Sequence, residues 1–485
     1  MGVVKNQSFY NTLTTYIGFG IGAFNVLILF THFLDDAYHG LVAFVLSTAN
    51  IMMPLFALGV HNSIIKYYSS FKSRIDRNRF LTLMLLFPLV LIIPIGLLGS
   101  FAYDTIVRIL TNQNEIIKEY VWLIYVAAIC FSYFEIFYSW AKVQMQSVFG
   151  NFMKEVFHRI CITGLFGLIY LEVMTVDAFI YAVIAVYVVR SFIMMIYAFD
   201  VRRPVFRLGT IPNLKSIIQY SLLIIIAGSV ATIILEIDKF MIGELLIIEN
   251  VAYYGVAIYI ATVIGVPARS MHQITNPITA KLLNENNRQG LESLYKKSSI
   301  NLFVISGLIF LLIISNINQL YDLIPEKFGG ALLVVVLVSL AKLSDNIIGN
   351  NNSILFNSKY YVAVLIFGVV LALVAVGLNW WLIPKYGING AAIATVISIF
   401  GYNTTKLLFV FLKFKLSPFT MNTVKTIVLI LVLAGAFYFW EFGFHPLINI
   451  AMKSLLIFLL YTLVVYVLNL SDDITAILDK YVPRL

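Results

Sequence analysis

Apolar runs of about 20 residues recur along the whole chain, the length that crosses the hydrocarbon core of a bilayer as a helix. The runs are continuous rather than alternating, and only helices or closed barrels satisfy backbone polar groups in lipid, which favours helices. The composition agrees: 61% of the residues are hydrophobic and 12% are charged, whereas soluble domains carry about 25% charged residues. The sequence therefore predicts an all-α integral membrane protein.

Windows of membrane-crossing length predict about fourteen transmembrane helices. They lie near residues 9–33, 40–60, 80–102, 119–141, 156–174, 177–199, 214–236, 250–273, 299–320, 331–355, 360–383, 388–411, 423–442 and 448–469. Basic residues gather in the loops after the second, sixth, eighth and twelfth spans, and the loops between them are short and acidic or neutral. This alternation follows the positive-inside rule and predicts that both termini are cytoplasmic. It also accounts for the net charge of +9 without a nucleic-acid partner.

Two similar stretches indicate an internal duplication. Residues 37–40 enter an apolar run that reaches Pro54, and residues 252–255 enter one that reaches Pro267. An apolar helix with acidic residues at its end precedes each run, and the second of these ends in a charged corner at 236–239. Two related halves of a membrane protein favour a transporter whose site lies between them.

The duplication predicts the domain organisation. We expect an N-terminal lobe of six helices at 1–200, a cytoplasmic linker at 201–215 and a C-terminal lobe of six helices at 216–412. Two extra C-terminal helices and a short tail follow at 413–485. The linker is placed by prolines and charges that oppose continuation of the sixth helix.

Polar and charged side chains form helical stripes inside several predicted spans, at spacings of three and four residues that place them on one face. The candidate site residues are the cations Arg269, Lys342 and Arg190, the polar Asn25, Asn50, Ser139 and Asn346, and the acids Glu135 and Asp345. Full charges within a bilayer usually face the bundle interior or a water-filled cavity, which favours a cavity for the charged members. Small and polar residues at this spacing also pack helices together, and that interpretation stays open for the uncharged ones.

The sequence contains no catalytic motif. There is no nucleophile elbow, no HExxH, no phosphate-binding glycine loop and no aspartate-rich sugar-nucleotide or metal cluster. We therefore expect no catalytic residue, no metal and no cofactor. A membrane-embedded polysaccharide polymerase or glycosyltransferase is the alternative from another class, but such enzymes need catalytic groups that these short external loops do not offer.

Three short stretches resemble a known family. Ile237–Gly243, followed by Tyr253-Tyr254-Gly255 and Val266-Pro267, resembles the start of the second half of bacterial polysaccharide flippases. Gly387–Thr395, at the entry to the twelfth span, is similar to the same proteins. The family is that of the Wzx-type transporters of O-antigen and capsule repeat units, in the multidrug/oligosaccharidyl-lipid/polysaccharide exporter superfamily. The likeness covers nearly the whole chain in span count and duplication.

The resemblance implies two six-helix lobes around a central cavity, followed by two extra helices. It also implies a flippase that moves an undecaprenyl-pyrophosphate-linked oligosaccharide across the bacterial inner membrane by alternating access, in lipopolysaccharide O-antigen or related synthesis. Its partners would be this lipid-linked oligosaccharide, membrane lipids and the polysaccharide polymerase and chain-length machinery. Arg269, Lys342 and Arg190 would meet the pyrophosphate, and Glu135 or Asp345 would carry a coupling proton or ion.

Two alternatives belong to the same superfamily. A multidrug exporter would favour twelve spans, an aromatic cavity and acidic residues for cationic drugs; Glu135 and Asp345 leave room for ion coupling in either case. A lipid II exporter differs from the repeat-unit flippase mainly in cargo.

Overall fold

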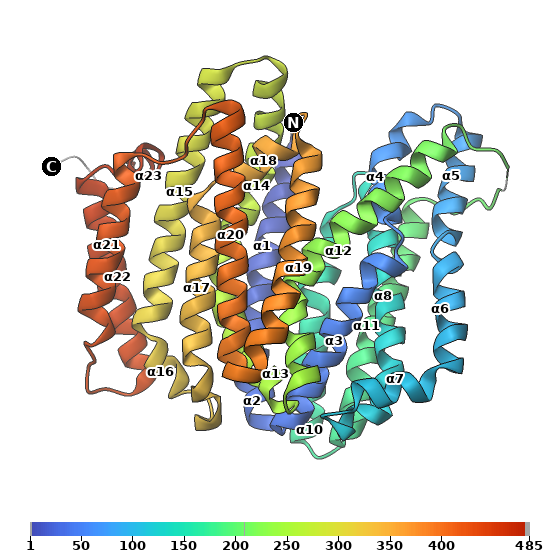
Figure 1. The fold of residues 1–485 in the computed structure, drawn as a ribbon, viewed down its shortest axis with the longest axis horizontal. Helices are drawn as coiled ribbons and strands as arrows, with labels where there is room; N and C mark the ends of the chain where they lie inside the picture. Colours follow the sequence, from blue (N-terminus) through green and yellow to red (C-terminus); the bar gives the residue numbers. More distant parts are fainter. Residues whose placement is uncertain (1, 208, 481–485) are drawn as a thin grey trace. The chain divides into compact units, whose positions relative to one another are not determined.

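The computed structural model describes residues 2–207 and 209–480, and every secondary-structure element in this part of the chain is a helix (Figure 1). Twelve of the described helices are long and apolar enough to cross a membrane, or thirteen if one bent pair counts as a span. The all-helical membrane fold is therefore confirmed, but the count of fourteen spans is not.

The chain divides into two compact units, which we call unit 1, as far as Gly255, and unit 2, from Val256. Helix α13 (Glu249–Thr262) runs through the boundary. The helices of unit 1 are α1 (Gly2–Phe24), η1 (Asn25–Leu29), α2 (Phe30–Phe33), α3 (Asp36–Phe56), α4 (Val60–Tyr67), η2 (Tyr68–Ser70), α5 (Arg74–Leu86), α6 (Leu89–Phe101), α7 (Tyr103–Leu110), η3 (Glu115–Tyr120), α8 (Val121–Lys142), α9 (Val148–Phe152), η4 (Met153–Phe157), α10 (His158–Tyr170), α11 (Val176–Val201) and α12 (Leu214–Leu245).

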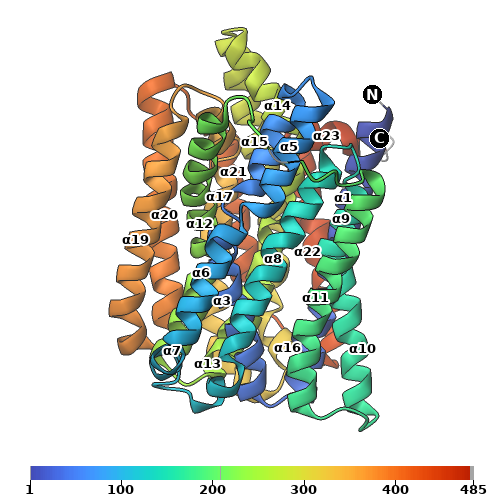
Figure 2. The ribbon, with the colours of Figure 1, turned by 90° about the vertical axis from the view of Figure 1, so that its right-hand side faces the viewer.

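The core of unit 1 is a row of packed helices. Helix α8 packs against α3 and α11, and α12 packs against α3 as well. Helices α10 and α11 lie side by side and are joined by a short turn (Figure 2). The approach of α12 to α3 depends on Gly243, because a Cβ atom at this position would overlap the ring of Phe44.

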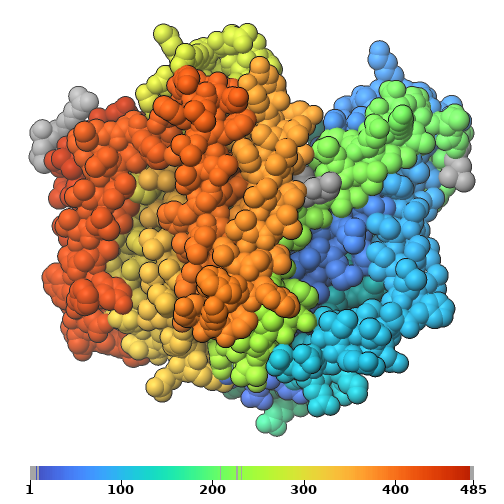
Figure 3. Space-filling view, in the orientation of Figure 1, coloured from blue at the N-terminus to red at the C-terminus, as the bar shows by residue number. Residues whose placement is uncertain are grey.

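Unit 2 contains η5 (Val263–Gly265), α14 (Val266–Asn284), α15 (Arg288–Ser315), α16 (Ile317–Tyr321), η6 (Glu326–Ala331), α17 (Leu332–Ile347), α18 (Asn351–Phe356), α19 (Tyr361–Tyr386), α20 (Ile388–Phe414), α21 (Met421–Tyr438), α22 (Pro446–Val467) and α23 (Asp472–Leu478). Helix α15 packs against α14, α17, α21 and α22. The last two long helices, α21 and α22, border α15 (Figures 1 and 3). Tyr461 of α22 donates a hydrogen bond of 2.8 Å to the Val304 carbonyl of α15.

Two sequence-based expectations differ from the observed helices. The predicted fifth span, 156–174, overlaps a helical stretch that begins at α9, continues through the π-helix η4 and ends with α10, and this stretch is not among the twelve spans. The charged corner predicted at 236–239 lies inside α12, where Lys239 pairs with Glu236 at 2.5 Å one turn away. The bend in α12 falls earlier, between Leu214–Val230 and Thr232–Leu245, at 49°.

The predicted linker coincides with a break between helices. Helix α11 ends at Val201 and α12 begins at Leu214, and the described residues between them form no helix. Residue 208 and residues 481–485, which the predicted linker and tail include, lie outside the described part. The boundary between the compact units falls at Gly255 rather than in the predicted linker, because α12 packs in unit 1. The boundary at 201–215 between two related lobes therefore stays a prediction.

Candidate functional site

Two of the predicted site residues meet at one helix break in unit 2, and a third lies about one turn beyond it. The 3-10 turn η5 separates α13 from α14 directly before Pro267, which has no N–H to continue the helix. Asn346 of α17 is buried and donates a hydrogen bond of 2.8 Å to the Ile264 carbonyl in this turn. The side chain of Lys342, also on α17, passes over Gly265, where a Cβ atom would stand 3.9 Å from its Cδ. Arg269 lies about one turn further along α14 and is exposed.

This arrangement has a physical reason. A broken membrane helix leaves carbonyl groups that neighbouring side chains must satisfy, and Asn346 does so for η5. Lys342 lies four residues before Asn346, so both side chains project from the same face of α17. The structure therefore brings Lys342 and Asn346 to one turn, as their spacing predicted, and places Arg269 on the helix that leaves it.

Asp345 has a partner that the sequence analysis did not identify. Lys406 of α20 is completely buried, and its Nζ lies 4.0 Å from the Asp345 carboxylate, whose side chain is 45% exposed. The same ammonium donates a hydrogen bond of 3.1 Å to Asn352 of α18 and lies 4.0 Å from the centre of the Tyr402 ring. Lys406 thus links α17, α18 and α20.

Arg190 is held in an aromatic cradle in unit 1. It lies on α11, is 7% exposed, and its guanidinium stacks at 4.3 Å from the Phe134 ring and 4.8 Å from the Tyr187 ring. Such stacking stabilises a desolvated cation. Its Nε is buried without a hydrogen-bond partner among the described residues. Arg190 therefore belongs to a different compact unit from Arg269 and Lys342.

Glu135 of α8 also has a lysine partner outside the predicted set. Lys154 of η4 donates a hydrogen bond of 2.6 Å to its carboxylate. Lys142 lies about two turns further along α8, with its ammonium 3.7 Å from the centre of the Tyr138 ring. Ser139, on the same stripe, is buried, and its hydroxyl has no partner among the described residues.

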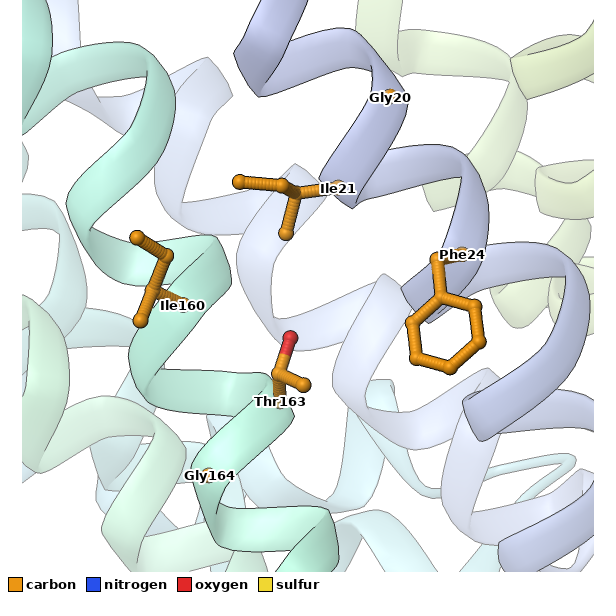
Figure 4. Close-up of a pocket in the computed structure, with 6 residues that line it drawn as sticks. All are labelled: Gly20, Ile21, Phe24, Ile160, Thr163 and Gly164. Atoms are coloured by element: carbon orange, nitrogen blue, oxygen red, sulfur yellow. The ribbon is translucent and has the colours of Figure 1, made fainter.

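Asn25 joins two helices of unit 1. Its amide donates 2.8 Å to the Arg159 carbonyl of α10, and its side-chain oxygen accepts a hydrogen bond of 2.7 Å from Thr163. Thr163 also borders a mostly apolar depression of about 600 Å³ between α1 and α10 (Figure 4). These bonds account for Asn25 as a link between helices. Asn50, on α3, is half-buried, and its role in a cavity stays a prediction.

The residues that sequence reasoning missed, Lys154 and Lys406, have a common feature. Each is a cation in or beside an apolar run, with another polar residue close by on its own helix: Glu155 directly after Lys154, and Asn403 three residues before Lys406. A lone charge at membrane depth demands a partner. That signal could have singled out both lysines, although it does not say which helix supplies the partner.

Comparisons with known proteins agree with this fold. The family profile described as "Polysaccharide biosynthesis protein" matches residues 4–282, more than half of the chain. No curated protein sequence matches the chain. Among solved structures, "Lipid II flippase MurJ, inward closed conformation" has a TM-score of 0.72 at 16% identity, over 94% of this chain and 98% of that chain.

Two further solved structures are transporters. An inward-facing multidrug resistance MATE family transporter of the MOP superfamily has a TM-score of 0.60 at 16% identity, over 86% of this chain and 95% of its own. A MOP superfamily transporter from Pyrococcus furiosus has a TM-score of 0.56 at 15% identity, over 85% and 96%. At these identities the likeness concerns the fold. From the family match and this fold, the chain is a multi-pass membrane transporter of the polysaccharide biosynthesis protein family, the Wzx-type flippase family of the multidrug/oligosaccharidyl-lipid/polysaccharide exporter superfamily.

Proposed function

We propose that the protein moves an undecaprenyl-pyrophosphate-linked oligosaccharide repeat unit across the bacterial cytoplasmic membrane by alternating access, with both termini in the cytoplasm. The observation that carries the proposal is a set of cations, Arg269, Lys342 and Arg190, inside candidate membrane spans of a chain from a polysaccharide biosynthesis family. A diphosphate head group that leaves water needs such groups to offset its charge. The similarity of fold to a lipid II flippase supports a lipid-linked cargo.

The candidate residues take different roles in this proposal. Lys342 passes over the helix break and Arg269 lies about one turn beyond it, so they are the first candidates for the diphosphate, with Arg190 as a further cation. Of the polar set, Asn50 and Ser139 are assigned to the sugar hydroxyls, because the side chains of Asn25 and Asn346 already bond the Arg159 and Ile264 carbonyls. Glu135 and Asp345 are the candidates for a coupling proton or ion. Rocking of two lobes around a fixed site would then provide alternating access.

A multidrug exporter of the same superfamily is the second candidate, since MATE transporters share the fold. A cationic drug needs an acidic group that is free to bind it. Here Glu135 is paired with Lys154 and Asp345 with Lys406, so both acids already have a cation at hand. This pairing favours an anionic cargo.

The test is a flipping assay in proteoliposomes that hold a short polyprenyl-pyrophosphate oligosaccharide, lipid II and a cationic drug in parallel samples. We expect movement of the lipid-linked oligosaccharide, and a loss of at least tenfold in Arg269→Ala and Lys342→Ala, which corresponds to about 1.4 kcal/mol. Lys425→Ala, an exposed cation on α21, is the matched control and should retain the wild-type rate.

Each outcome separates one part of the proposal. Movement of the drug alone would make the protein a multidrug exporter, and movement of lipid II alone would change the cargo. If both alanine variants transport normally at equal expression, the assignment of Arg269 and Lys342 is wrong. If Glu135→Gln and Asp345→Asn leave the ion and pH dependence of transport unchanged, neither acid is the coupling group.

A further inference from the structure

One carboxylate and two ammonium groups lie together on α8 and η4 of unit 1. The Glu135 carboxylate and the Lys154 ammonium are 2.6 Å apart. Lys142 follows Glu135 by seven residues, so it projects from the same side of α8 two turns away. The Glu135 carboxylate interacts electrostatically with both lysines, and with His61 of α4. A single carboxylate therefore serves two ammonium groups.

The other charged groups nearby add one positive charge to this excess. Glu155, the next residue after Lys154, lies 3.8 Å from Arg159 one turn along the helix and is engaged there. Arg190 interacts electrostatically with Glu135 but is stacked on aromatic rings. Four cations thus face two carboxylates, which leaves an excess of two positive charges in this part of unit 1. That excess matches the two negative charges of a diphosphate diester.

The exposure of the pair determines which partner an incoming molecule meets. The Lys154 side chain is 45% exposed, whereas that of Glu135 is 15% exposed. An ammonium this exposed lies in water rather than in lipid, because a charge in lipid is costly. Lys154 also lies in the π-helix η4, a rare geometry that occurs frequently at functional sites. An anion can therefore approach Lys154 without moving the carboxylate first.

We propose that Glu135 is an internal competitor of the head-group diphosphate for Lys154 and Lys142, and so raises the charge that a head group needs in order to bind here. This inference rests on the proposed function. A diphosphate has enough acceptor oxygens to bind both ammonium groups at once, which compensates for the Glu135 contact that it replaces. A neutral head group cannot replace the contact between Glu135 and Lys154. A singly charged head group exchanges that contact for one of its own and forms no second one.

The test measures binding to the full-length protein in nanodiscs, with two probes: farnesyl pyrophosphate, which carries at least two negative charges, and farnesyl methyl phosphate, a diester that carries one. In the wild type we expect the pyrophosphate probe to bind more tightly than the singly charged probe. Glu135→Gln removes the competitor and should tighten both probes about tenfold, since a hydrogen bond to a charged group is worth about that factor. Lys154→Gln should weaken pyrophosphate binding about tenfold, and Lys154→Arg should preserve it.

Two controls separate competition from general charge. Glu155→Gln removes the neighbouring carboxylate, which is paired with Arg159, and should change the affinity by less than threefold. In the double variant Glu135→Gln/Lys154→Gln, most of the gain from Glu135→Gln should disappear, because Lys154 is the ammonium that Glu135 contacts directly. Glu135→Asp keeps the charge and serves as the second variant if the Gln variant does not fold.

An unchanged or weaker affinity of folded Glu135→Gln overturns the proposal, and so does a gain that persists in full in the double variant. Transport of the lipid-linked oligosaccharide is measured in the same preparations. If the wild type transports it and Glu135→Gln shows no gain in binding, only the competitor role fails. If the wild type neither binds farnesyl pyrophosphate nor transports, the proposed function fails as well.

Discussion

Replacing Asp345 by Asn is expected to destabilise the protein more than replacing its partner Lys406 by Met. The reason is the asymmetry of the pair: Lys406 is completely buried, whereas the Asp345 side chain is 45% exposed. Removal of the carboxylate leaves a buried ammonium without a counter-charge, but removal of the ammonium leaves a carboxylate that water already solvates. Breaking a buried ion pair from one side is costly, while replacing a buried ion by an apolar group of similar shape is often neutral.

The magnitude follows from the distance. Two unit charges 4 Å apart interact with about 4 kcal/mol at an effective dielectric constant of about 20. The exposure of Asp345 screens the pair, so we take about 2 kcal/mol for Asp345→Asn. Lys406→Met removes the hydrogen bond to Asn352, which lowers the free energy of unfolding by about 1 kcal/mol. The apolar methionine side chain in the same space offsets part of this loss.

The assay is thermal unfolding of the purified protein in detergent, followed by tryptophan fluorescence. The Tm should fall more in Asp345→Asn than in Lys406→Met, and the double variant should resemble Lys406→Met alone, because no buried charge remains. Glu285→Gln is the control: its pair with Lys281 is at least half exposed on both sides and should contribute nothing measurable. A larger loss in Lys406→Met, or no loss in Asp345→Asn, would refute the reasoning.

Three further predictions concern the same two units and use the same unfolding assay. Gly349→Ala should lower the free energy of unfolding by at least about 2 kcal/mol, because φ of Gly349 is +52° and a Cβ atom there would stand 2.6 Å from a backbone nitrogen of α15. Gly377→Ala is the control and should not destabilise the protein, because Gly377 lies inside α19 with open space around its Cβ position. Asn346→Leu should lower stability by about 1–3 kcal/mol, since the η5 carbonyl loses its bond; an unchanged Tm would mean that this bond is dispensable. Arg190→Lys should lower the Tm although the charge is kept, because an ammonium does not stack as a planar guanidinium does; equal Tm values would contradict the aromatic cradle.

The sequence predicted the helices because membrane spans depend on local composition. The break at 202–213 could be predicted from its prolines and charges, and the interruption before Pro267 from the missing N–H. The fifth span was harder, because the helical stretch there begins before residue 156, carries Lys154, Glu155 and Arg159 and includes a π-helix, which apolar windows do not detect. The expectation that the helix ends in a charged corner at 236–239 was wrong for a similar reason. The ion pair between Lys239 and Glu236, three residues apart, lets α12 continue through these charged residues.

The candidate site could be predicted only along single helices. Helical spacing correctly placed Lys342 and Asn346 on one face of α17, and the structure adds that this face meets η5. Spacing contains no information about the partner from another helix. The pair of Glu135 with Lys154 joins residues 19 positions apart, and the pair of Asp345 with Lys406 joins two helices with α18 and α19 between them in the chain. Tertiary packing decides such pairs.

The two pairs have opposite exposure, and this difference separates the two roles proposed for their carboxylates. In the Glu135–Lys154 pair, the lysine side chain is the more exposed member: 45% of it is exposed, against 15% for Glu135. In the Asp345–Lys406 pair, the aspartate side chain is the more exposed member: 45% of it is exposed, against 0% for Lys406. An anionic head group can therefore reach Lys154, whereas it cannot reach Lys406. A coupling proton or cation can reach Asp345 more readily than Glu135. These exposures favour Asp345 as the coupling group and Glu135 as the competitor of the diphosphate, so Asp345→Asn should alter the ion dependence of transport while Glu135→Gln alters the affinity for the head group.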